Sequence, residues 1–181
     1  MGPLEVVALA IWIMLPAYIP NNAAVLVGGG RPIDGGRDFR GARLLGDGKT
    51  WRGTLGGIAA GIVVALALTA LVPTVADATG FDVPTFSPAA TVTLPTGALL
   101  GDIGASFLKR RLGHERGSAV VGLDQYDLVI GSLGLTALVA WGWLAAVLTP
   151  WILVAIIVAT PLLHLATNMI AYALGLKDVP W

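Results

Sequence analysis

The stretch GTLGGIAAGIVVALALTALV, residues 53–72, contains no charged residue. A helix that crosses the hydrocarbon core of a bilayer needs about 20 mostly apolar residues, and this stretch has that length. Gly53, Gly57 and Gly61 recur at steps of four, a pattern that lets two membrane helices pack closely through small residues. The stretch therefore predicts a transmembrane helix with one tightly packed face.

The composition of the whole chain agrees with a membrane location. The 181 residues are 56% hydrophobic and 12% charged, whereas soluble domains carry roughly 25% charged residues. So few charges cannot cover a water-facing surface, and the length suits one integral membrane domain over residues 1–181. The absence of cysteine excludes disulfides and thiolate metal sites.

Four further stretches are apolar and long enough to be candidate spans. They are residues 4–27, 89–108, 126–148 and 151–174. The least apolar is 89–108, because it contains Pro95, Asp102 and Ser106. The N-terminal leader MGPLE has no positive charge, which argues against a cleaved signal peptide. We therefore expect an all-α polytopic membrane protein with five transmembrane helices.

The basic residues are concentrated in two segments between these spans. Of the eleven Lys and Arg residues, all but Lys177 lie in residues 28–52 or 109–125. The segment 73–88 contains none and carries two aspartates instead. Because basic loops stay on the cytoplasmic side, we expect both basic loops and the C-terminus to be cytoplasmic and the N-terminus to lie outside the cell membrane.

The segment LGDGKTWRG, residues 45–53, contains the second half of a nucleotide-binding P-loop. Gly48, Lys49 and Thr50 supply its last three residues, but Arg43 stands where its first glycine is required. Lys49 still offers a cation and Thr50 a hydroxyl next to a helix N-terminus, which favours anions. The segment either handles phosphate or is a plain basic loop held near anionic lipid headgroups.

The stretch GDIGASFLKRRLGHERGSAVVGLDQYD, residues 101–127, begins with an acidic residue inside a predicted span. An ionisable residue in a membrane helix usually faces a cavity or a partner and marks function. Asp102, Ser106 and Lys109 are spaced so that all three lie on one helix face. Asp102 is therefore a candidate site residue near the cytoplasmic interface. The alternative is that Asp102 forms only a structural salt bridge with Lys109 or Arg110.

Asp124 and Asp127 begin the next span, one helical turn apart, where a helix N-terminus favours negative charge. If the two spans pack together, these carboxylates converge with Asp102. Clustered carboxylates repel one another, and Mg²⁺, which prefers oxygen ligands and shares its coordination sphere with substrate phosphates, would relieve that repulsion. Nearby cations would hold the remaining phosphate oxygens: Lys49, Lys109 and Arg110. This arrangement is typical of phosphoryl or nucleotidyl transfer.

Two further pairs of polar residues interrupt apolar helices. Asn21 and Asn22 lie near the cytoplasmic end of the first span, and His164 and Asn168 lie one turn apart in the last. Each can form a hydrogen bond between helices or line a cavity, and for His164 we favour the cavity. All four are candidate substrate-binding residues.

Taken together, the two motifs resemble those of a known enzyme family. GDIGASFLKRR followed by LDQYD is similar to the signature of the CDP-diacylglycerol synthase family, and GDGKTWRG resembles its Ser-Pro-x-Lys-Thr-x-Glu-Gly segment. The closer resemblance is to the compact archaeal branch, the CDP-archaeol synthases. It implies a Mg²⁺-dependent membrane cytidylyltransferase that transfers CMP from CTP to an isoprenoid glycerol-phosphate lipid and releases pyrophosphate.

By motif position, the resemblance also implies roles for individual residues. Asp102 and Asp124 are implied metal ligands, with Asp127 close by. The residues implied in phosphate handling are Lys49, Thr50, Lys109 and Arg110, and we add Ser106 as a substrate-binding candidate. The chain departs from the bacterial pattern at Gln125, where that pattern has Arg, so a second metal ion is not implied.

Two other classes compete with this interpretation. DGGRDFRGAR, residues 34–43, is faintly similar to a motif of CDP-alcohol phosphatidyltransferases, but its spacing differs. A proton-coupled transporter would use Asp102 and His164 as relays, but it should also show an inverted repeat, which we do not find. No set of base-stacking aromatic residues indicates nucleic acid as a partner, so CTP and a membrane lipid phosphate are the expected partners, and the oligomeric state stays open.

Overall fold

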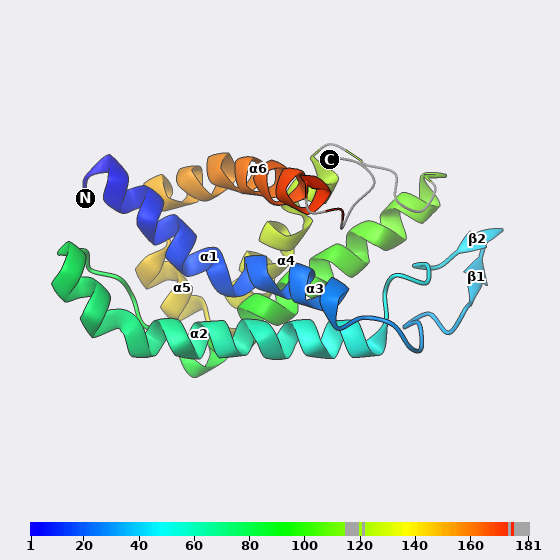
Figure 1. Cartoon of the computed structure of the whole chain (residues 1–181), viewed down its shortest axis with the longest axis horizontal. Helices are drawn as coiled ribbons and strands as arrows, with labels where there is room; N and C mark the ends of the chain where they lie inside the picture. The colour runs from blue at the N-terminus through cyan, green and yellow to red at the C-terminus, as the bar shows by residue number, and fades with distance from the viewer. Residues whose placement is uncertain (115–119, 121, 174, 176–181) are drawn as a thin grey trace.

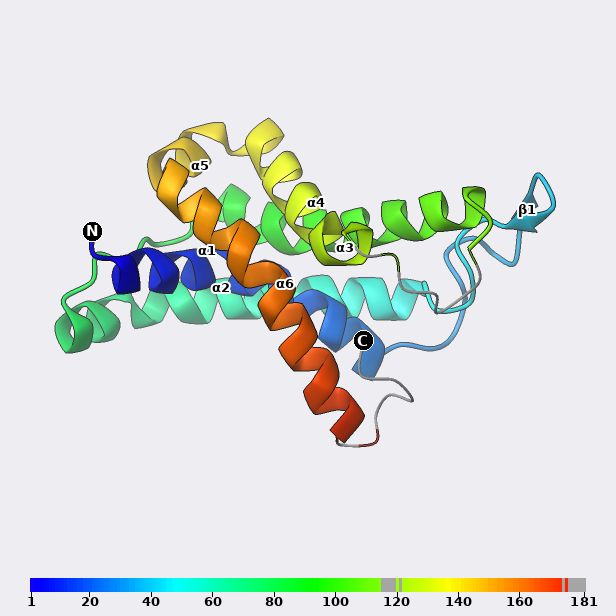
Figure 2. The ribbon, with the colours of Figure 1, turned by 90° about the horizontal axis from the view of Figure 1, so that it is seen from above.

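The computed structural model describes residues 1–114, 120, 122–173 and 175, and it is mostly helical (Figure 1). Its elements are α1 (Pro3–Leu26), β1 (Asp38–Phe39), β2 (Ala42–Arg43), α2 (Trp51–Thr79), α3 (Pro88–Arg111), α4 (Leu123–Val139), α5 (Trp141–Val147) and α6 (Pro150–Ala173). Helices α1, α2 and α3 follow the long axis of the molecule, and α6 crosses them obliquely (Figure 2). The antiparallel β1–β2 hairpin extends from the end opposite the N-terminus.

Three helices in the described part are long and apolar enough to cross a membrane: Pro3–Leu26, Trp51–Thr79 and Pro150–Ile170. They coincide with the first, second and last predicted spans. Helix α3 covers the predicted span 89–108 without a break. The five spans, their grouping in one domain and their orientation across the membrane stay predictions. Arg116, Lys177 and the predicted end of the last span at residue 174 lie outside the described residues.

The predicted span 126–148 is wrong as a single helix, because the chain bends at Ala140 and forms α4 and α5. Ala140 has φ −131° and ψ 39°, outside the helical region. The bend brings the indole nitrogen of Trp143 to the carbonyl of Thr85, to which it donates at 2.8 Å. The same ring lies 5.5 Å from that of Phe86. This hydrogen bond links residues 58 positions apart in the sequence, so the contact is tertiary.

Helix α2 is longer than the second predicted span, which ends at residue 72. Helix α2 continues through Pro73 and ends at Gly80, whose φ of 72° supplies the left-handed C-terminal conformation that glycine adopts most easily. The connection to α3 is therefore shorter than the predicted segment 73–88. It ends at Ser87, whose hydroxyl caps α3 by accepting the N–H of Ala90 at 3.1 Å.

Glycines bring two pairs of helices close together. The predicted packing face of α2 is confirmed: a Cβ added at Gly57 or Gly61 would lie 2.6 Å from a carbonyl oxygen of α1. A second close contact, not predicted, joins α3 and α4. A Cβ on Gly101 would lie 2.0 Å from the carbonyl oxygen of Asp127, and one on Gly131 would lie 2.2 Å from that of Gly97. This second contact fixes Asp127 beside the residue that precedes Asp102.

Buried hydroxyl pairs add specific links between helices. Tyr18 on α1 and Thr160 on α6 share a hydrogen bond of 2.8 Å, and Thr93 on α3 and Thr136 on α4 share one of 2.9 Å. Polar side chains inside a membrane bundle are commonly paired in this way. The main apolar core lies between α1, α4 and α6, around Ile13, Met14 and Ile156.

Candidate active site

A cavity of about 580 Å³ lies among α1, the start of α2, α3, α4 and α6. It is lined by most of the polar residues that the sequence singled out: Asn21, Asn22, Lys49, Thr50, Asp102, Lys109, Asp124, Asp127, His164 and Asn168. These residues come from both sequence motifs and from the two ends of the chain. The fold therefore collects them at one place.

Lys49 and Asp102 join the two motifs directly. The Nζ atom of Lys49 lies 2.5 Å from Oδ2 of Asp102, and both side chains are about one-quarter exposed. Lys49 is placed by the start of α2, where the next residue, Thr50, accepts the N–H of Gly53 at 3.1 Å and caps the helix. The hydroxyl of Thr50 is buried in this capping role, while Lys49 reaches across to α3.

A second ion pair connects α3 with α4. The Nζ atom of Lys109 donates to Oδ1 of Asp124 at 2.6 Å, and Oδ2 of Asp124 accepts the N–H of Val120 at 2.9 Å. The simpler alternative for Asp102, a salt bridge to Lys109 or Arg110, is not the pairing found, because Asp102 pairs with Lys49. Both predicted carboxylates thus face a lysine across the cavity.

Asp127 is the third carboxylate of the cavity, and one of its oxygens accepts the N–H of Leu128. Within the described residues, no three acidic or histidine side chains are grouped closely enough to hold a metal ion. The donor chemistry nevertheless suits a hard divalent cation, because oxygen ligands from α3 and α4 line one cavity. The two lysines supply the positive charge that these carboxylates require.

The same cavity also has apolar walls. They are formed by α1 and α6 and include Ile11, Leu15, Ile19, Leu163 and Leu165. The cavity is therefore lined by charged side chains and by apolar ones. Such a cavity is complementary to a molecule with an anionic head and a hydrocarbon tail.

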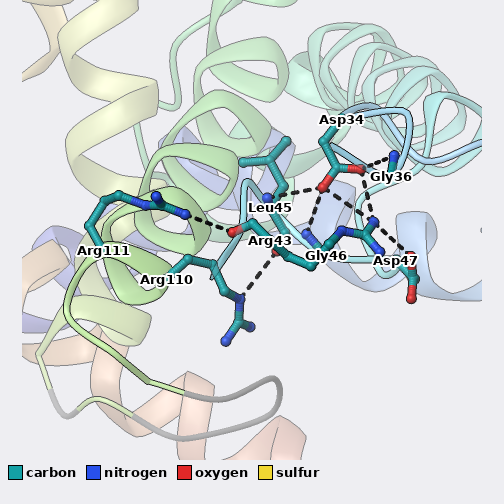
Figure 3. Close-up of polar contacts among 8 residues, drawn as sticks. All are labelled: Asp34, Gly36, Arg43, Leu45, Gly46, Asp47, Arg110 and Arg111. Carbon is teal, nitrogen blue, oxygen red and sulfur yellow. Dashed lines mark hydrogen bonds and ion pairs between the residues drawn. The ribbon is translucent and has the colours of Figure 1, made fainter. Parts of the chain in front are cut away.

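Ser106 and Arg110, both predicted to bind substrate, lie elsewhere. Ser106 is buried and is not among the residues that line the cavity. Arg110 faces a second cavity of about 510 Å³ between the hairpin and the end of α3, which Arg43 and His114 also line. Its Nε is 3.5 Å from the carbonyl of Leu45 (Figure 3). Its guanidinium also donates to the carbonyl of His114.

Asp34 is not among the predicted site residues, although it is the carboxylate with the most hydrogen bonds in the described part of the chain. It accepts hydrogen bonds from the N–H groups of Gly36, Leu45 and Gly46 and from the guanidinium of Arg43 (Figure 3). Burial alone would raise the pKa of Asp34, but these donors outweigh it and hold the pKa well below its usual range. The sequence feature that could have indicated this role is Asp-Gly-Gly at residues 34–36, because this pattern favours a turn closed by the aspartate carboxylate.

The fold and the cavity define a helical membrane protein with a cavity that is lined by both charged and apolar side chains. Residues 4–181 match the family described as CarS-like CDP-archaeol synthase. The chain belongs to the CDP-archaeol synthase family, and the resemblance carried by the two motifs is confirmed.

Curated relatives and a solved structure agree with this assignment. The CDP-archaeol synthase of Halorubrum lacusprofundi is 60% identical over 98% of each chain, and that of Haloarcula marismortui is 60% identical over the full length of both. The CDP-archaeol synthase of Methanosphaerula palustris is 52% identical over 93% of this chain and all of its own. A solved structure, described as an intramembrane enzyme for archaeal membrane lipids biosynthesis, is 39% identical with a TM-score of 0.70, covering 88% of this chain and 92% of that one.

Proposed function

We propose that the protein transfers CMP from CTP to the phosphate of an isoprenoid glycerol lipid, giving a CDP-lipid and pyrophosphate. The observation that carries this proposal is a cavity in which the lysines and carboxylates of both motifs meet and which apolar side chains also line. Family membership and the name CDP-archaeol synthase shared by its relatives support it. They also remove the phosphatidyltransferase and transporter alternatives.

The chemistry requires positioning more than proton transfer. An oxygen of the lipid phosphate attacks the α-phosphorus of CTP and forms a P–O bond, while the bond to the β-phosphate oxygen breaks and pyrophosphate leaves. A phosphate monoester with a second pKa of about 6 is already a dianion near neutral pH, so no general base is needed. Lys49 and Lys109 hold the phosphate oxygens and stabilise charge on the departing pyrophosphate.

Asp102 and Asp124, with Asp127 beside them, are the residues that would hold a divalent cation, which we propose is Mg²⁺. When bound, such an ion neutralises phosphate charge and orients the triphosphate. Asp102 pairs with Lys49 and Asp124 with Lys109, and all four side chains line the cavity. In the proposed role, each lysine exchanges its carboxylate partner for a substrate phosphate.

The apolar walls of α1 and α6 would receive the lipid. Asn21, Asn22, His164 and Asn168 also line the cavity and would contact the glycerol phosphate or the nucleotide. We propose that the lysines and carboxylates of the cavity lie on the cytoplasmic side of the cell membrane, which would let CTP arrive from water and the lipid from the bilayer. The basic loops support this orientation.

A labelling experiment tests the reaction. Purified protein in lipid nanodiscs is incubated with CTP labelled at the α-phosphate, Mg²⁺ and an isoprenoid glycerol-phosphate lipid. We expect label in the lipid phase and one pyrophosphate released for each label transferred. A phosphatidyltransferase would instead need CDP-lipid and release CMP. Failure to transfer label to any phosphate lipid, with folded protein and Mg²⁺ present, would refute the proposal.

A further inference from the structure

The loop between α1 and α2 carries Lys49, and its two arms are bound to each other. The N–H of Ile33 donates to the carbonyl of Lys49 at 2.8 Å, and the N–H of Trp51 donates to the carbonyl of Arg31 at 3.2 Å. Pro32 and Thr50 form the isolated bridge between these two hydrogen bonds. The backbone of Lys49 is therefore fixed by the residues that immediately precede Asp34.

Asp34 extends this connection with its side chain. The carboxylate is fully buried and gathers donors from both arms: its own turn at Gly36, the guanidinium of Arg43, and the N–H groups of Leu45 and Gly46, each at 3.0–3.1 Å. Figure 3 shows these contacts converging on one side chain. Leu45 and Gly46 begin the LGDGKT segment, so the carboxylate restrains the phosphate-handling half-loop from its N-terminal side.

The hairpin between the two arms is attached to α3, the helix that carries Asp102. The guanidinium of Arg111 donates to the carbonyls of Phe39, Ala42 and Arg43. Arg43 in turn bridges Asp34 and Asp47 with contacts of 3.0 and 2.8 Å. The loop that bears Lys49 is thereby held relative to its partner helix through backbone and carboxylate contacts.

We propose that Asp34 is a positioning residue for the transfer reaction: its buried carboxylate holds residues 45–49 in the conformation that directs Lys49 into the cavity towards Asp102. The inference rests on the proposed function in that it takes Lys49 to handle substrate phosphate. A P-loop shapes its turn with a glycine that this chain lacks, because Arg43 occupies that position. Here an upstream carboxylate and that same Arg43 supply the restraint.

The chain contains no cysteine, so a single introduced thiol reports the position of residue 49 without interference. A Lys49→Cys variant, purified in nanodiscs, is reacted with a polar maleimide, and the labelling rate is measured. Replacing the carboxylate by an amide, Asp34→Asn, leaves backbone donors facing an NH₂ group and should release the loop. We expect labelling of Cys at position 49 to become about tenfold faster in the Asp34→Asn background.

Two controls separate loop release from general loosening. Asp38→Asn changes an exposed carboxylate in the same loop and should leave the labelling rate unchanged. The second control is Thr167→Cys, which places a thiol on α6 at a position that also lines the cavity. Its labelling rate should be the same whether residue 34 is Asp or Asn. Equal acceleration at both thiols, or none at position 49, would overturn the proposal.

If Asp34→Asn does not give a monodisperse protein, Arg43→Gln replaces it as the test. This change removes the charged donor and leaves the backbone donors in place, so it should accelerate labelling at position 49 by a smaller factor. An unchanged rate in this variant would equally contradict the proposal.

Transfer activity, measured in the chain without an introduced cysteine, provides an independent test. Asp34→Asn should lower kcat about tenfold or more, measured well below the melting temperature of the variant, since misplaced groups cost rate even when the fold persists. An inactive natural chain would refute the proposed function without affecting the thiol result. An active natural chain whose Asp34→Asn variant shows unchanged labelling and unchanged kcat would refute the positioning role alone.

Discussion

Lys49, just before α2, and Asp102, within α3, form an ion pair with Nζ and Oδ2 2.5 Å apart. The two residues are 53 positions apart in the sequence and belong to different motifs. Their contact joins the half phosphate loop to the acidic helix, and it lies in the cavity that also contains Asp124. The reaction proposed above depends on this junction, so its carboxylate is the first target for substitution.

Asp102→Asn should lower the rate of CMP transfer by about two orders of magnitude, because it removes both an implied metal ligand and the partner that orients Lys49. The measurement is label transfer from CTP to lipid, with size-exclusion elution as the check of folding. Asp77→Asn, at an exposed position near the opposite end of α2, is the matched control and should keep full activity. An active Asp102→Asn protein would contradict the role of this carboxylate.

Asp124→Asn should raise the Mg²⁺ concentration needed for half-maximal transfer by about tenfold or more, since loss of a carboxylate near a metal weakens its binding. A chelator should abolish transfer by the natural chain, and added Mg²⁺ should restore it. The measurement is the rate of transfer over a series of Mg²⁺ concentrations at fixed CTP. An identical Mg²⁺ dependence in the variant would exclude Asp124 as a ligand.

Gly101→Ala should destabilise the contact between α3 and α4. The new methyl group would lie 2.0 Å from the carbonyl oxygen of Asp127, and overpacking of this kind costs about 1–3 kcal/mol. Gly104→Ala is a matched control on the same helix, because a Cβ there meets nothing within 4 Å. We expect a lower melting temperature for the first variant only. Equal melting temperatures would show that the two helices separate without cost.

The contribution of Asp34 to stability should not depend on pH near neutrality. Its folded-state pKa is lowered by the donors around it, so the stabilisation is complete above its unfolded-state pKa of about 4 and is lost only as the pH falls through the lower folded value. The difference in melting temperature between the natural chain and Asp34→Asn should be constant from about pH 6 to 9 and shrink below about pH 4. A difference that varied across the neutral range would contradict this assignment. The charged groups around Asp34 in this loop are Arg43 and Asp47.

Most helices could be predicted from the sequence because each is a long apolar run with a charged or proline-rich boundary. The bend at Ala140 could not be predicted, since the hydrogen bond from Trp143 to Thr85 that accompanies it joins residues 58 positions apart, which local hydrophobicity does not encode. The continuation of α2 through Pro73 was missed because a proline in the sequence usually indicates the end of a helix. The helix instead ends where Gly80 adopts a positive φ.

Motif spacing predicted which charged residues would line one cavity, but neighbours in sequence need not share a face. Arg110 is rotated about 100° from Lys109 around the helix and faces the hairpin cavity instead. Ser106 lies on the face that packs against other helices. Asp34 was missed because its partners lie on the returning arm of the loop, and no periodicity in the sequence connects the two arms.

The apolar walls that α1 and α6 give to the cavity affect how the product is distributed. A lipid that occupies this site never has to leave the bilayer. The nucleotide-activated lipid is therefore released directly into the plane of the membrane. The next enzyme to use it would encounter it by lateral diffusion, at a concentration set by membrane area and not by cell volume.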